Sequence, residues 1–169
     1  MRGDGLHGDQ GAGSRFARKT SGGKMSELTL AKAQIVLSAA LEKAGALSLS
    51  PLAIAVLDAR GALKAYGAQD GTSLKRGEIA LGKAKGALAL GVGSRSLFRR
   101  AKDQPFFIAA ATSAVGGDLV PVPGGVLIRD AAGAIIGVVG VSGDTSDNDE
   151  ACAVAGIAAA GFTADPGQD

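Results

Sequence analysis

Residues 52–66 read LAIAVLDARGALKAY, and residues 126–141 read VLIRDAAGAIIGVVGV. Each stretch holds an apolar run, an Asp-x-x-Gly turn and a second apolar run. The aspartates, Asp58 and Asp130, can open the turn through a side-chain acceptor, and Gly61 and Gly133 can supply the positive φ that closes it. Two hairpins with the same turn signature predict an antiparallel sheet.

Helical periodicity surrounds these hairpins. Apolar residues recur every three to four positions in 26–45, 73–90, 94–103 and 147–162, which predicts four helices. Residues 119–122 are a predicted strand, whereas residues 106–112, after Pro105, fit either a short helix or a buried strand. The whole pattern indicates an α/β (α+β) domain with an antiparallel sheet of about five strands and helices packed on it.

The composition favours a globular core of small aliphatic side chains. Hydrophobic residues make up 46% of the 169 positions and charged residues 20%. The single cysteine excludes an intrachain disulfide and a multi-cysteine zinc site, so we expect no metal centre. We expect a reducing, cytoplasmic location for the same reason. No apolar run is long enough for a membrane helix, so no membrane partner is expected.

The first 24 residues differ from the rest. They are rich in glycine, serine and charge, with five basic and two acidic side chains and no apolar period. We expect residues 1–24 to be a disordered tail or leader, with a basic targeting arm as the alternative, and residues 25–169 to be the folded domain. That domain is close to neutral and poor in aromatics, which gives no footprint for nucleic acid.

The segment 140–150, GVSGDTSDNDE, leaves a predicted strand and enters a predicted helix. Its serines and acids suit helix capping, and contact of Ser142, Asp144 or Glu150 with a ligand or cation is the alternative. The glycines at 91–93 and 137–143 do not stand between a strand and a helix in the GxGxxG spacing, so they do not predict a dinucleotide site.

Catalytic options are limited because the only histidine, His7, lies in the tail. Ser-His-Asp and Cys-His arrangements are therefore excluded from the domain, and whether the protein is an enzyme stays open only for lysine or carboxylate chemistry. Arg76 and Lys83 stand seven apart on one predicted helix, hence on roughly one face. They could hold a carboxylate, with Asp70 and Ser142 approaching from neighbouring loops; a solvated helix face is the alternative.

Several ordered blocks resemble the GlcG/HbpS family, which includes the C-terminal domain of PduO-type proteins. They are IAVLDARG at 54–61, the Asp70-Gly71 and Lys83-Ala84 pairs, PGG at 123–125, GVSG at 140–143 and the Asp149-Glu150 pair. The resemblance covers nearly all of residues 26–163. It implies a profilin-like fold, with a five-stranded antiparallel sheet sandwiched between helices, and self-association from dimer to octamer.

The same resemblance implies binding of haem or a corrinoid-related ligand and an accessory role in small-molecule catabolism. Haem-binding members often use a histidine near the porphyrin, and this domain has none. Axial ligation would then fall to Thr112, Tyr66, Lys83 or the tail's His7. Thr112 therefore joins Arg76, Lys83, Asp70 and Ser142 in the expected ligand site.

Three function classes follow from these observations. The first is an oligomeric small-molecule-binding protein for an anionic ligand or tetrapyrrole. The second is an accessory catabolic enzyme that acts on a small carboxylate through Lys83 or a carboxylate side chain. The third is a structural oligomerisation subunit.

Overall fold

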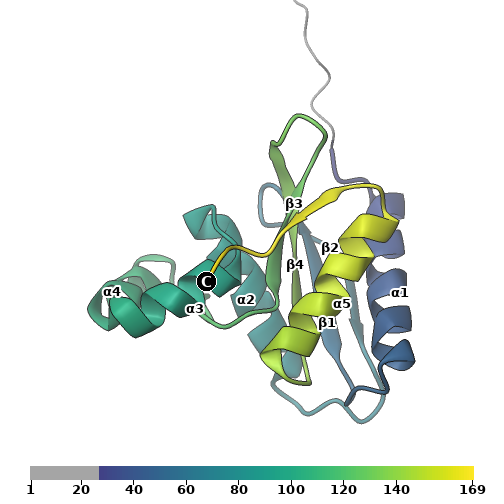
Figure 1. Ribbon diagram of the computed structural model, residues 1–169, viewed down its shortest axis with the longest axis horizontal. Helices are drawn as coiled ribbons and strands as arrows, with labels where there is room; N and C mark the ends of the chain where they lie inside the picture. Colours follow the sequence, from purple (N-terminus) through teal and green to yellow (C-terminus); the bar gives the residue numbers. More distant parts are fainter. Residues whose placement is uncertain (1–26) are drawn as a thin grey trace, which may run out of the picture.

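A five-stranded antiparallel sheet forms the centre of the protein, whose structure is a computed structural model that describes residues 27–169 (Figure 1). The strands lie in the order β2-β1-β4-β3-β5. Their bounds are β1 Ala53–Asp58, β2 Leu63–Ala68, β3 Gly125–Arg129, β4 Ile135–Ser142 and β5 Thr163–Asp165. The expected α+β class and antiparallel sheet are confirmed. The predicted tail, residues 1–24, lies outside the described residues.

The two hairpins, β1-β2 and β3-β4, close with the same turn chemistry. In each, the aspartate Oδ1 accepts hydrogen bonds from the amides two and four residues later, at 2.9 and 3.0 Å for Asp58 and at 3.0 and 2.9 Å for Asp130. Gly61 and Gly133 adopt φ values of 80° and 84°, which side-chain-bearing residues disfavour. Each hairpin also shifts its register beside the turn. The local turn signature therefore forms as predicted.

Helices cover both faces of the sheet. α1 (Leu30–Ala46) and α5 (Ser146–Ala159) pack side by side on one face, and α2 (Arg76–Leu90) lies on the other (Figure 1). Along β1, Ile54 and Val56 join the core beneath α1 and α5, whereas Ala55 and Leu57 join the core beneath α2. Because both faces are covered, the whole of β1 is buried, which explains its unbroken apolar sequence.

Small residues let α2 approach the sheet closely. A Cβ added at Gly140 in β4 would overlap the carbonyl oxygen of Ala80 in α2, and one added at Gly86 would lie 2.9 Å from a Leu119 side-chain carbon. The glycine in β4 is therefore required by the close contact between strand and helix.

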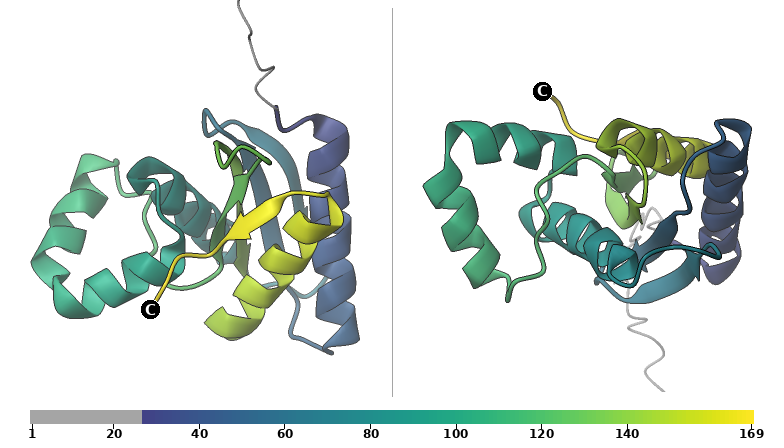
Figure 2. Two further views of the ribbon diagram at one scale, coloured as in Figure 1. Left: turned by 45° about the horizontal axis from the view of Figure 1, so that its top comes forward. Right: turned by 90° about the horizontal axis from the view of Figure 1, so that it is seen from below.

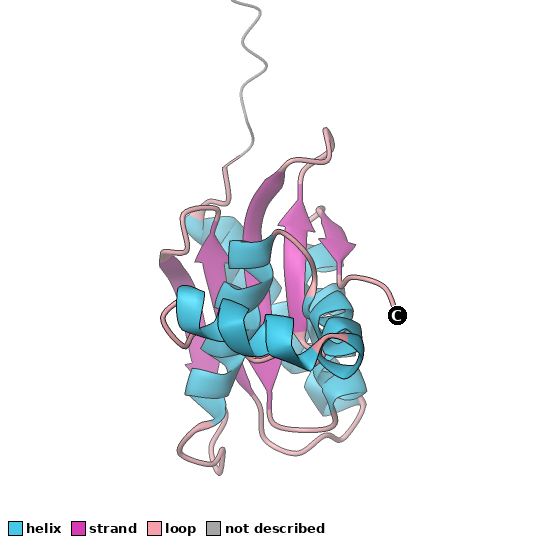
Figure 3. Cartoon of the chain, turned by 90° about the vertical axis from the view of Figure 1, so that its left-hand side faces the viewer, coloured by secondary structure: helices cyan, strands magenta, loops and turns pink. Residues whose placement is uncertain are grey.

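Two further helices form an arm that projects from the body (Figures 1 and 2). α3 (Ser94–Asp103) leads through Gln104 into α4 (Pro105–Ala114), whose first residue is a proline, as suits the first turn of a helix. Figure 3 views the molecule from the side of the arm, with these helices in front of the sheet. α4 carries no charged residue, and its Phe106 side chain is 91% exposed.

The structure shows which secondary structure residues 106–112 and 119–122 adopt. Residues 106–112 form part of helix α4. The prediction of a strand at 119–122 is wrong: the Val120 amide donates to the Gly82 carbonyl of α2 at 3.1 Å, and Pro121 and Pro123 cannot donate to a ladder. The fifth strand is instead β5, after the last helix. None of the helices in residues 27–169 is long and apolar enough to cross a membrane.

Candidate functional site

The first turn of α2, the end of β4 and the start of α5 meet at one end of the sheet. Arg76 is the first residue of α2, and Ser142 is the last residue of β4. The Nη1 of Arg76 donates to the Oγ of Ser142 at 3.4 Å, a long hydrogen bond. Ser142 is fully buried, whereas the Arg76 side chain is partly exposed. The guanidinium is thus held beside the sheet while part of it faces solvent.

Lys83 lies two turns further along α2 and forms a buried ion pair with Asp149 of α5. The Nζ of Lys83 donates to the Oδ2 of Asp149 at 2.8 Å and to the Val141 carbonyl oxygen at 2.9 Å. The two side chains are 3% and 1% exposed. Burial lowers the pKa of Lys83 and raises the pKa of Asp149, because each charged form loses hydration, and their mutual attraction opposes both changes.

The Asp149 carboxylate is held from a second side, since its Oδ1 accepts the amide of Asp144 at 3.0 Å. Gly124 packs against the same pair: a Cβ there would lie 3.0 Å from the Lys83 Nζ and 3.2 Å from the Asp149 Cβ. The pair is therefore enclosed by the sheet, two helices and a glycine loop. It joins helices on opposite faces of the sheet at the end of β4.

The loop before α5 is fixed by Asp144. Its Oδ2 accepts the amide of Ser50 at 2.9 Å, and its Oδ1 accepts the Asn148 side-chain amide at 2.7 Å. These hydrogen bonds, first that from Asn148, lower the pKa of Asp144 to about 2. Thr145 caps α5 by accepting the Asn148 amide at 3.3 Å. The segment caps α5 as predicted, but the cap is Thr145 and not one of the serines or acids that the sequence suggested.

The structure brings together three of the five residues in the expected ligand site, Arg76, Lys83 and Ser142. Asp70 is exposed in the loop after β2, where it borders a hollow of about 480 Å³ beside Pro51 and Gln69. Thr112 lies in α4 on the arm, and its hydroxyl donates to the Ile108 carbonyl at 2.7 Å. No hydrogen bond or ion pair within residues 27–169 joins either of them to Arg76, Lys83 or Ser142.

Tyr66 of β2 is a neighbour of this junction that spacing alone does not reveal. Its hydroxyl lies against the backbone of Gly77 in α2, where an added Cβ would overlap the phenol oxygen. The Tyr66 side chain is 46% exposed, and Leu74, just before α2, is 90% exposed. A tyrosine, an arginine and an apolar side chain consequently gather around the start of α2.

Arg95 forms a second ionic cluster near the start of α3. Its guanidinium donates to Glu150 at 3.1 Å, to Asp147 at 2.6 Å and to Asp169 at 3.2 Å. Hydrogen bonds that the guanidinium donates to these carboxylates, first to Glu150, raise the pKa of Arg95 above its ordinary value. The cluster fastens the arm to α5 and to the last residues of the chain, so Glu150 serves an ion pair here.

Comparisons with known proteins match the fold of this chain. The family model described as "Haem degrading protein HbpS-like" matches residues 28–158. A comparison with curated proteins found no match. Among solved structures, the PduOC:Heme complex is similar with a TM-score of 0.73 and 26% identity, covering 85% of this chain and 100% of that one.

Two further structures resemble the chain. The structure of HbpS has a TM-score of 0.67 and 28% identity, covering 84% of this chain and 96% of its own. The Klebsiella pneumoniae protein ORFY, assigned to family DUF336, has a TM-score of 0.70 and covers 82% of this chain and 95% of its own. Its 24% identity supports the shared fold alone.

Proposed function

We propose that the chain, which belongs to the HbpS-like family of haem-degrading proteins, binds a small anionic ligand, and that haem or a related tetrapyrrole is this ligand. The observation that carries the proposal is the structural similarity to the PduOC:Heme complex, which extends over the full length of the PduOC chain. With it we propose a cytoplasmic location and an accessory role in small-molecule catabolism, as the sequence resemblance implies.

The surface around the start of α2 suits such a ligand. The partly exposed Arg76 guanidinium can bind a carboxylate or propionate through two parallel hydrogen bonds while Ser142 holds it in place. Tyr66 and Leu74 supply exposed aromatic and aliphatic surface beside it. A ligand with an apolar body and peripheral carboxylates matches this arrangement.

The donor set near this surface fits a haem bound through oxygen. Residues 27–169 contain no histidine, the Lys83 ammonium is held by Asp149, and the Thr112 hydroxyl lies on the arm. Within residues 27–169 Tyr66 is the remaining candidate, while His7 lies outside the described residues, and a phenol oxygen is a known ligand of haem iron. Haem would supply the iron, and the protein would position it through Tyr66 and orient its propionates through Arg76.

Titration of the full-length chain with haem, followed by visible absorbance, tests the proposal. We expect a Soret band that saturates with haem and changes position in the Tyr66→Phe variant. Arg76→Ala should weaken binding by about 1.5 to 3 kcal/mol, the scale of a charge-assisted hydrogen bond. Lys85→Ala is the control, because Lys85 lies further along α2 in an exposed ion pair with Asp118.

A titration without a Soret band would exclude haem, and the same titration with hydroxocobalamin then tests a corrinoid. If the parent chain, Tyr66→Phe and Arg76→Ala bind haem with equal affinity, the haem site does not lie at the start of α2. The enzymatic alternative through Lys83 needs an accessible amine, and the buried pair with Asp149 does not favour it. We therefore advance the binding function alone.

We also propose self-association, in the range from dimer to octamer, with α4 as a contact surface. The helix is uncharged and apolar, and Phe106 and Phe107 are exposed on the projecting arm. The residues of α4 would bring no like charges together across a two-fold axis, and the Arg100 guanidinium of α3 lies 5.0 Å from the Phe107 ring centroid beside them. Burial of Phe106 in that contact would remove its apolar surface from water.

Light scattering at tens of micromolar protein checks this second proposal. The parent chain should be larger than a monomer, and Phe106→Asp should shift it toward the monomer. Arg99→Asp, on the neighbouring α3, controls for a new negative charge on the arm. A parent that is monomeric at this concentration would contradict self-association.

A further inference from the structure

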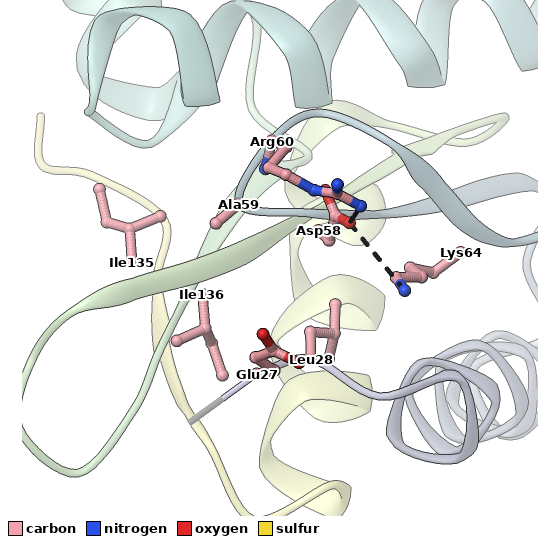
Figure 4. A pocket seen from close by; sticks show the side chains of 8 residues that line it. All are labelled: Glu27, Leu28, Asp58, Ala59, Arg60, Lys64, Ile135 and Ile136. Atoms are coloured by element: carbon pink, nitrogen blue, oxygen red, sulfur yellow. Dashed lines mark hydrogen bonds and ion pairs between the residues drawn. The ribbon is translucent and has the colours of Figure 1, made fainter. Parts of the chain in front are cut away.

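A cavity of about 430 Å³ lies at the end of the sheet opposite to Ser142 (Figure 4). It is bordered by the β1-β2 turn, the start of β4 and the residues that precede α1. Leu28 and Ile136 border it from the core beneath α1 and α5 and are each only 3% exposed, whereas Ile135 borders it from the α2 face and is partly exposed. Its size is in the range of small-molecule sites.

One wall of the cavity carries more positive charge than its local carboxylate neutralises. Asp58 uses Oδ1 to accept two amides of its own turn, so only Oδ2 is left for cations. The Arg60 Nη2 lies 3.1 Å from this oxygen and the Lys64 Nζ lies 4.0 Å from it. Two cations thus share one carboxylate oxygen, and most of their hydrogen-bond donors stay free for another anion.

Asp58 itself stays ionised. Its burial raises its pKa, but hydrogen bonds from Ala62 and Arg60 outweigh that effect and hold the pKa below its ordinary value. The carboxylate therefore stays committed to the turn and to the two cations, and the surplus positive charge at this wall persists at neutral pH.

The opposite wall carries the reverse charge. Figure 4 shows Glu27 beside Leu28, across the cavity from Asp58 and Arg60. Among the ion pairs within residues 27–169, none involves Glu27, whose carboxylate is thus available to a cation. The cavity accordingly presents an anion-binding wall and a cation-binding wall, with the partly exposed Ile135 at its border.

We propose that this cavity binds the zwitterion of an apolar α-amino acid. The carboxylate lies at Arg60 and Lys64, the ammonium lies at Glu27, and the side chain packs beside Ile135, the partly exposed aliphatic residue of the lining. A simple carboxylate or a simple amine would leave one charged wall unmatched. The site is separate from the surface at Arg76, since β4 begins at this cavity and ends at Ser142.

The first test is NMR of the full-length chain labelled at isoleucine δ1 methyls. The probes are L-phenylalanine, 3-phenylpropionate and 2-phenylethylamine, which differ only in the charged groups. L-phenylalanine should shift the Ile135 and Ile136 methyls through its ring current and leave that of Ile108, on the arm, unmoved. The two analogues should bind on the order of ten-fold more weakly, because each lacks one charge-assisted contact.

Variants separate charge recognition from apolar binding. Glu27→Gln should weaken L-phenylalanine about ten-fold and remove its advantage over 3-phenylpropionate, and Arg60→Ala should remove its advantage over 2-phenylethylamine. Lys75→Ala and Glu78→Gln, which remove the same charges from an exposed pair on α2, should change neither affinity. Equal affinities for the three probes, or methyl shifts away from Ile135 and Ile136, would overturn the proposal.

Discussion

Replacing Lys83 with methionine tests the buried ion pair most directly. Methionine keeps the unbranched stem but removes the charge that Asp149 faces at 2.8 Å, in a site where the two side chains are 3% and 1% exposed. An uncompensated buried charge costs about 3 to 5 kcal/mol. We expect Lys83→Met to lower the free energy of unfolding by that amount, measured by urea denaturation.

The same helix provides a matched control. Lys85 also forms an ion pair at 2.8 Å, with Asp118, but those side chains are 40% and 56% exposed. Solvent screens such pairs, so Lys85→Met should cost less than about 1 kcal/mol. The reasoning fails if Lys83→Met is no more destabilising than Lys85→Met.

The pH dependence of the loss gives a second readout. In Lys83→Met, Asp149 stays buried and loses its cation, so its folded-state pKa lies above the ordinary value of 3.8. The folded state of the variant then binds a proton more tightly than the unfolded state, and its stability falls as pH rises through that pKa. The stability gap to the parent should therefore widen from pH 5 to pH 8, and Asp149→Asn added to Lys83→Met should recover most of it.

Three further outcomes follow from the structure. Burial raises the pKa of Cys152 to about 11, so the native protein should react with iodoacetamide at pH 8 at least about a hundred-fold more slowly than the unfolded chain. Gly140→Ala should destabilise by about 1 to 3 kcal/mol in thermal unfolding, because the new Cβ meets the Ala80 carbonyl. The depressed pKa of Asp144 contributes stability above pH 3.8 that is lost toward pH 2, so urea titrations of parent and Asp144→Asn should converge in that window.

The hairpins could be predicted from the sequence because their information is local. Asp58 and Gly61 act within four residues of each other, and the structure gives the second turn, at Asp130 and Gly133, the same hydrogen bonds. The helix at 94–103 was also predictable, because its charged and apolar residues alternate with helical period. Such features depend little on the rest of the fold.

The strand assignments at the edge of the sheet were harder to predict. Residues 119–122 are apolar and short, as a strand is, but their course is set by a contact with Gly82 of α2 that no local pattern encodes. The true edge strand, β5, has three residues and takes its place by pairing with β3. Pairing with β3 thus determines that these residues form a strand, and three residues are too few for sequence periodicity to reveal one.

The candidate site shows the same division between local and distant information. Helical spacing placed Arg76 and Lys83 on one face of α2 but could not tell which would meet solvent. That depends on Asp149, which is 66 positions away and reaches Lys83 only because α2 and α5 approach the end of β4 from opposite faces of the sheet. A basic residue among small residues such as Ala80 and Ala84 was the available signal, since only a buried carboxylate makes that position tolerable. The lysine is therefore held by an ion pair inside the fold, whereas the arginine keeps part of its side chain in solvent.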